Sequence, residues 1–117
     1  MFRCRAVVHQ PVYEHNEKKY LRLRVPPEVA RIITNIEAKN AYKLSKGAYV
    51  YEDFFNDTLV IKVPFRYRRV MCPVTGTKPL QELEAGDEVQ VEVDYTGTWT
   101  AGNHTGHSWK IKNVHTY

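Results

Sequence analysis

The chain has very little cysteine and no long apolar stretch. Its 117 residues include two cysteines, Cys4 and Cys72, and two thiols do not build the disulfide framework of a small secreted domain. No apolar run approaches the roughly 20 residues that a membrane-spanning helix needs, and residues 1–5 lack the apolar segment of a signal peptide. We therefore expect one intracellular domain over residues 1–117, cytoplasmic or nuclear, with no membrane partner.

Sequence signatures of catalysis and of cofactor binding are missing as well. There is no Walker loop, no nucleophile elbow and no GxGxxG motif. Cys72 and Lys78 have the spacing of a cysteine-phosphatase loop, but a lysine cannot make the two-pronged contact to phosphate that an arginine makes. His104 and His107 would supply only half of a tetrahedral metal site, and the pair Glu52–Asp53 has no visible apolar pocket to perturb it. We therefore predict no enzymatic activity, no cofactor and no metal.

What the chain does contain is apolar–polar alternation, the pattern of half-buried strands. The alternating segments are 2–9, 19–25, 58–70, 88–95 and 108–115. Residues 27–43 instead carry apolar side chains at the i, i+3, i+4 and i+7 spacing of one helical face. Residues 71–79 and 96–107 are rich in Gly, Pro, Thr and His and are predicted to be loops, the second of them mobile. These patterns predict a mostly β fold with one α-helix near residues 27–43.

Basic side chains occupy outward positions on three of the predicted strands. Segments 2–9 and 19–25 are expected to pair as an antiparallel hairpin, which crowds arginines on one face. Like charges on neighbouring strands destabilise a sheet, and a bound phosphate backbone would remove that repulsion. The candidate nucleic-acid-binding residues are Arg3, Arg5, Tyr20, Arg22, Arg24, Lys62, Arg66, Arg68 and Trp99. The alternative is that these residues only form a solvated outer face.

The last two predicted strands carry charges of opposite sign. Glu88, Glu92 and Asp94 alternate along one strand, and Lys110 and Lys112 alternate along the next. Across a hairpin such charges neutralise each other, so we interpret both lysines as structural.

The two tryptophans have different surroundings in the sequence. Trp109 stands at an inward position of its strand and is predicted to be core. Trp99 is flanked by small polar residues, and it either stacks on a base or caps the barrel.

The C-terminal third resembles the closing strands of OB-fold proteins. The resemblance lies in the Gly86–Asp87 turn, the alternating valine strand that follows it, Trp99, and the final segment 108–114. It implies a five-stranded Greek-key barrel that binds single strands across its face, with loops closing around them. Tyr20, Arg22 and Arg24 would then lie on the second strand. The helix departs from the family, because it follows the second strand instead of lying between the third and the fourth.

The sequence thus predicts a barrel or strongly curved antiparallel sheet, OB-like, with one helix. The function that we expect is non-catalytic binding of single-stranded DNA or RNA by basic and aromatic residues. The alternative is a protein-interaction or assembly module, a homo-oligomer included, for which the aromatic stretch at Tyr49–Tyr51 and a sheet edge near Pro64 would serve. A small enzyme is the third possibility, and no constellation of residues supports it.

Overall fold

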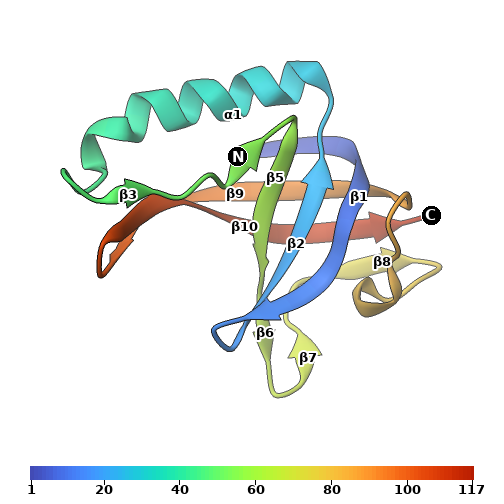
Figure 1. Ribbon diagram of the computed structural model, residues 1–117. Helices are drawn as coiled ribbons and strands as arrows, with labels where there is room; N and C mark the ends of the chain where they lie inside the picture. Colours follow the sequence, from blue (N-terminus) through green and yellow to red (C-terminus); the bar gives the residue numbers. More distant parts are fainter.

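The computed structural model describes residues 1–117 and confirms a mostly β fold with one α-helix, with 56% of the residues in strands and 17% in helices (Figure 1). In chain order the elements are β1 (Phe2–His15), β2 (Lys18–Arg24), α1 (Pro27–Asn40), the 3₁₀ turn η1 (Ala41–Lys43), β3 (Tyr49–Val50), β4 (Phe54–Phe55), β5 (Thr58–Val63), β6 (Phe65–Arg66), β7 (Arg69–Val70), β8 (Val74–Gly76), the 3₁₀ turn η2 (Leu80–Glu82), β9 (Glu88–Ala101) and β10 (His104–Thr116).

Five strands close into a curved, barrel-like sheet in the order β1, β2, β5, β10, β9. The long strand β1 pairs antiparallel with β9 through its first half and with β2 through its second half. Strand β5 pairs antiparallel with β2 and meets β10 in parallel at Lys62 and Lys110, which closes the ring. The short strands β3 and β8 extend the sheet by pairing in parallel with β10.

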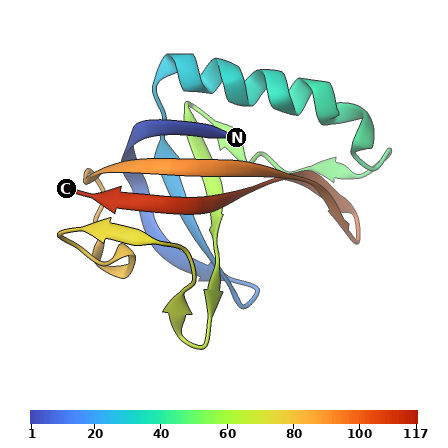
Figure 2. The same ribbon diagram turned by 180° about the vertical axis from the view of Figure 1, so that it is seen from behind.

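Apolar side chains fill the interior, as the alternation predicted. Twenty buried residues form one core cluster, and they come from all five barrel strands, from α1 and from the η2 region. Helix α1 begins at Pro27, whose fixed φ suits a first helical position, and buries Val29 and Ile33 against the barrel. Leu80 and Leu83, in η2 and just after it, belong to the same core. The η2 segment lies on the side of the barrel away from α1 (Figures 1 and 2). None of the helices is long and apolar enough to cross a membrane.

The prediction of one strand over residues 58–70 is wrong. Strand β5 ends at Val63, because Pro64 has no N–H to donate to a ladder, and the chain then folds back as the small hairpin β6–β7. The turn of this hairpin is formed by Tyr67 and Arg68, which have φ values of 54° and 63°. Tyr67 therefore does not lie on a core face; its side chain is 85% exposed.

The predicted mobile loop at residues 96–107 is also not found. Strand β9 continues to Ala101, and β10 begins at His104 after a turn at Gly102 and Asn103. The threonines of this segment favour extended backbone, so they continue the ladder. The result is a long two-stranded arm that projects from the barrel beneath one end of α1 (Figures 1 and 2). Part of the other predicted loop, residues 71–79, is the strand β8.

Candidate nucleic-acid interface

The outer face of β2 and β5 holds four of the predicted binding residues. Tyr20 lies opposite Lys62 in the register of these strands, and Arg22 and Arg24 follow along β2, while the leucines between them are buried. Arg22 Nη1 donates a hydrogen bond to Thr58 Oγ1 at 2.9 Å. Arg24 Nη1 donates to a backbone oxygen in the β4–β5 turn at 3.0 Å. Both acceptors are neutral, so the two guanidinium charges are positioned but not compensated.

Aromatic rings form a row beside these cations. Tyr13 of β1 stacks on Tyr20 with ring centroids 5.8 Å apart. Burial raises the pKa of both phenols, and the Tyr51 phenol adds a smaller contribution in the same direction. The ring of Tyr51 lies 6.3 Å from that of Trp99. We call Tyr20, Tyr13, Tyr51 and Trp99 the aromatic row; it consists of two ring pairs, one on the β1–β2 hairpin and one at the β9–β10 arm.

Trp99 is held in place on this arm and does not belong to the core cluster. Its Nε1 donates a hydrogen bond to the His107 backbone oxygen at 3.2 Å. Its ring lies over Gly106, where an added Cβ would come within 3.0 Å of the ring. The half-buried indole is therefore pre-positioned. Trp109, by contrast, is buried in the core, as predicted.

Three lysines gather where β5 meets β10. The pKa of Lys62 is lowered by burial and by the positive charges of Lys18 and Lys110. None of the three ammonium groups lies within 4.0 Å of a carboxylate. Lys110 lies opposite Asp94 in the ladder but forms no ion pair with it, so the structural pairing expected for this lysine is not made.

Arg3 and Arg5 lie elsewhere, on the β1–β9 side. The prediction that they face Arg22 and Arg24 across a hairpin is wrong, because β1 is long and only its second half pairs with β2; Val7 is the partner of Arg24. Arg3 pairs instead with Glu92 at 3.2 Å.

The other basic residues of the β1–β9 side are also compensated. Arg5 pairs with Glu88 at 3.3 Å, and Lys112 lies 4.0 Å from Glu92, as its predicted structural role required. Hydrogen bonds from Asn113 and Arg3 lower the pKa of the Glu92 carboxyl. Each of these three cations therefore has a carboxylate within 4.0 Å, with Glu92 shared by two of them.

Arg66 and Arg68 lie in the β6–β7 hairpin, which projects near the β1–β2 turn (Figures 1 and 2). Both are exposed and neither has a carboxylate within ion-pair distance. The ammonium group of Lys19 lies 5.2 Å from the ring centroid of Phe65, which connects the base of this hairpin to β2.

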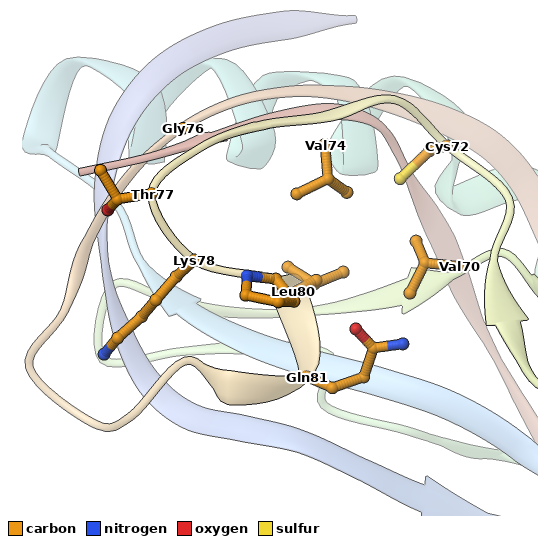
Figure 3. Close-up of a pocket in the computed structure, with 9 residues that line it drawn as sticks. Val70, Cys72, Val74, Gly76, Thr77, Lys78, Leu80 and Gln81 are labelled. Carbon is orange, nitrogen blue, oxygen red and sulfur yellow. The ribbon is translucent and has the colours of Figure 1, made fainter.

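A hollow of about 510 Å³ opens between the β7–β8 segment and η2 (Figure 3). Val74 and Cys72 point into it from one side and Leu80 lies on the other, whereas Lys78 extends away. Lys78 Nζ pairs with Asp87 Oδ2 at 2.8 Å, and burial raises the pKa of the Cys72 thiol. The segment therefore has neither the reactive thiolate nor the phosphate cradle of a phosphatase loop.

A buried acid, Asp53, lies in the same segment as Tyr51, between β3 and β4. Asp53 is 4% exposed, and its Oδ2 has no hydrogen-bond partner. Burial, followed by the neighbouring Glu37 carboxyl, raises the pKa of Asp53 to about 9. Glu37 Oε2 accepts a hydrogen bond from Trp109 Nε1 at 2.9 Å. The prediction that Asp53 lacks an apolar environment is wrong, because the β3–β4 segment folds under α1.

His104 and His107 do not converge on a common ligand. His104 is exposed on the arm, whereas His107 is buried, with its Nδ1 2.8 Å from the Tyr95 hydroxyl. Residues three apart on a strand face opposite ways, which separates the two imidazoles. No group of three or more His, Cys, Asp or Glu side chains is arranged to hold a metal ion.

Sequence reasoning missed three members of this surface. Tyr13 lies between the alternating segments 2–9 and 19–25 and belongs to neither of them, although strand β1 continues to His15. The sequence suggests Tyr51 only for protein contacts and Lys110 only for charge pairing.

The chain matches no protein-family model, and comparisons with curated proteins and with solved structures gave no match.

Proposed function

We propose that this protein binds single-stranded DNA or RNA and catalyses no reaction on it. One observation carries the proposal: the aromatic row lies beside cations that have no carboxylate partner. Those cations are Arg22, Arg24, Lys18, Lys62 and Lys110. The two kinds of side chain are the two that a single strand requires, because its bases stack and its phosphates are anionic.

The energetics favour this ligand over a duplex. Stacking on an aromatic side chain contributes roughly 1–3 kcal/mol per base, and it requires bases that are not already paired and stacked in a helix. Lysine and arginine beside the row would neutralise phosphates and release counterions. Arg22 is especially suited to this role, because its hydrogen bond to Thr58 restricts the side chain before any ligand arrives.

The distribution of charge supports the assignment of this face. On the β1–β9 side, Arg3 and Arg5 are engaged by carboxylates, so we leave both outside the proposed surface. On the β2–β5 side, burial and then the positive charges of Lys18 and Lys110 lower the pKa of Lys62, so like charges lie close together there. A bound polyanion would therefore relieve charge repulsion on the β2–β5 side and not on the β1–β9 side.

The strand order supports the OB-like hypothesis. In OB-folds the face of the second and third strands, together with the loops after the first and fourth strands, binds the ligand. The corresponding parts here are β2 and β5, the β1–β2 turn and the β9–β10 arm. The helix, which lies between the second and third barrel strands, departs from that family.

Fluorescence anisotropy with a labelled oligothymidine of about 15 nucleotides tests the proposal. The test variant is Arg22→Gln, Lys62→Gln, Lys110→Gln. We expect weaker binding, and a plot of log affinity against log salt that is flatter by about 2, because each lost phosphate contact removes about 0.7 from the slope.

The matched control is Arg3→Gln, Arg5→Gln, Lys112→Gln, which removes the same charge from the paired side. We expect its salt slope to remain near that of the wild type. Equal effects of the two triple variants would show that only total charge matters, and absence of binding by the wild type would refute the proposal.

A protein-interaction module is the second candidate, and the edge strand β3 favours it. Strand β3 pairs only with β10, and Tyr49 and Val50 are exposed on it. An unpaired edge with exposed apolar side chains is a template for another chain. Under this alternative, sedimentation would show an oligomer that Val50→Lys disrupts and that oligothymidine leaves unchanged.

A further inference from the structure

The β6–β7 hairpin has a turn whose side chains do not suit its backbone. Three turns in the chain have two consecutive non-glycine residues with positive φ, and two of them begin with Asn16 or Asn56. Asparagine tolerates the left-handed region well. The third turn uses Tyr67 and Arg68, a bulky pair that rarely adopts it. These residues are therefore poorly explained by turn stability and better explained by what they present to a ligand.

Charge on the same hairpin is also unfavourable for folding alone. Arg66 and Arg69 are direct cross-strand partners, and like charges in that position destabilise a hairpin. Together with Arg68 they place three guanidinium groups within four consecutive exposed residues. No carboxylate lies within 4.0 Å of any of them. An oligoanion would compensate this charge, and arginine forks well onto phosphate.

The hairpin begins directly after the strand that carries Lys62 and lies beside one end of the proposed binding face. Strand β5 leads into it through Pro64, only two residues after Lys62. The base of the hairpin is closed by a hydrogen bond from Met71 N to the Pro64 oxygen at 2.8 Å. The ammonium group of Lys19, which pairs with Glu14, lies 5.2 Å from the Phe65 ring centroid, so the base of the hairpin lies beside β2 near the β1–β2 turn. Figures 1 and 2 show the hairpin projecting past the β1–β2 turn, on the side of the molecule away from α1.

We infer that the β6–β7 hairpin is a phosphate-binding finger that holds the part of a single strand extending beyond the barrel face. The inference rests on the proposed function and adds a second contact region to it. Guanidinium groups of Arg66, Arg68 and Arg69 bind the phosphates, and Tyr67 at the tip stacks on a base. A short oligonucleotide occupies the barrel face alone, whereas a longer one also reaches the finger.

Oligothymidines of two lengths, about 6 and about 15 nucleotides, test this division. The finger variant is Arg66→Gln, Arg68→Gln, Arg69→Gln. We expect it to bind the longer strand about tenfold more weakly than the wild type at low salt, with a flatter salt dependence. Its affinity for the shorter strand is expected to remain unchanged.

A second variant, Tyr67→Asn with Arg68→Gly, distinguishes lost ligand contacts from misfolding of the hairpin. It installs a favourable turn, so we expect equal or higher thermal stability together with weaker binding of the longer strand. If both variants bind the longer strand as the wild type does, the finger is refuted while the proposed function stands. Equal losses of affinity for the two lengths would also refute the proposal that the finger holds the part of the strand beyond the barrel face. If the wild type binds neither strand, the proposed function itself fails.

Discussion

Tyr13 and Tyr20 stack across the β1–β2 hairpin with ring centroids 5.8 Å apart and ring planes 29° apart. The two residues are direct cross-strand partners, so the backbone register fixes the pair. Both rings are half-buried, and burial raises the pKa of each phenol. A stacked pair that is held in this way offers a flat, rigid surface next to Arg22 and Lys62. Because the tyrosine side chains are already ordered, they lose little conformational entropy when a base stacks on them.

Replacing Tyr20 by alanine tests this aromatic surface. We expect Tyr20→Ala to weaken binding of a labelled oligothymidine on the order of tenfold, because stacking contributes roughly 1–3 kcal/mol per base. The salt slope is expected to stay the same, since no phosphate contact is removed. Anisotropy titrations at several salt concentrations measure both quantities.

Tyr42→Ala is the matched control for this experiment. Tyr42 lies in η1, outside the aromatic row, and is more exposed than Tyr20. Its replacement is expected to leave affinity unchanged. If the two variants bind equally well, the row is not a stacking surface.

The contact between Trp99 and Gly106 gives a second prediction. Gly106→Ala places a methyl group about 3.0 Å from the indole ring, so the ring must shift while the indole itself is retained. We expect binding several-fold weaker than that of the wild type. Because Trp109 is buried, quenching of tryptophan emission by oligothymidine reports on Trp99, and this quenching should decrease in the variant.

Ser108→Ala provides the comparison for Gly106→Ala. Ser108 occupies the next position on the same face of β10 and lies opposite Gly97, not Trp99. Its replacement should leave both quenching and affinity as they are in the wild type. A Gly106→Ala protein with unaltered binding would show that the position of the indole is irrelevant to the ligand.

Alternation predicted the barrel interior correctly because burial follows a period of two along any strand. Phe2, Leu21 and Trp109 are all buried as expected. The pattern failed where local chemistry interrupts it. Pro64 ends β5 although the alternation continues to Arg68. The glycines and threonines of the arm form a ladder although they resemble a loop.

The candidate site could be predicted only in part, because a strand has two neighbours and the sequence does not name them. Tyr20, Arg22 and Lys62 are adjacent through the pairing of β2 with β5. Arg3 resembles Arg22 in sequence context, but its neighbour is Glu92 of β9, 89 positions away. No local pattern distinguishes the compensated arginine from the uncompensated one, since register and barrel closure decide it.

The buried carboxyl of Asp53 gives a prediction about pH. Its pKa is raised from 3.8 to about 9, by burial and by Glu37, while the unfolded chain loses this proton near the ordinary value. Between these two pH values the folded protein therefore holds one more proton than the unfolded chain. The free energy of unfolding must then fall as pH rises through this window.

Asp53→Asn keeps a neutral side chain of the same shape and removes this titration. We expect its free energy of unfolding to exceed that of the wild type by an amount that grows between pH 5 and pH 9, the span that the two pKa values bracket. Urea denaturation at several pH values measures the difference. Asp57→Asn, at an exposed turn position four residues along the chain, should give a curve parallel to that of the wild type. If Asp53→Asn also gives a parallel curve, Asp53 is ionised in the folded protein and the buried carboxyl must have a partner that compensates its charge.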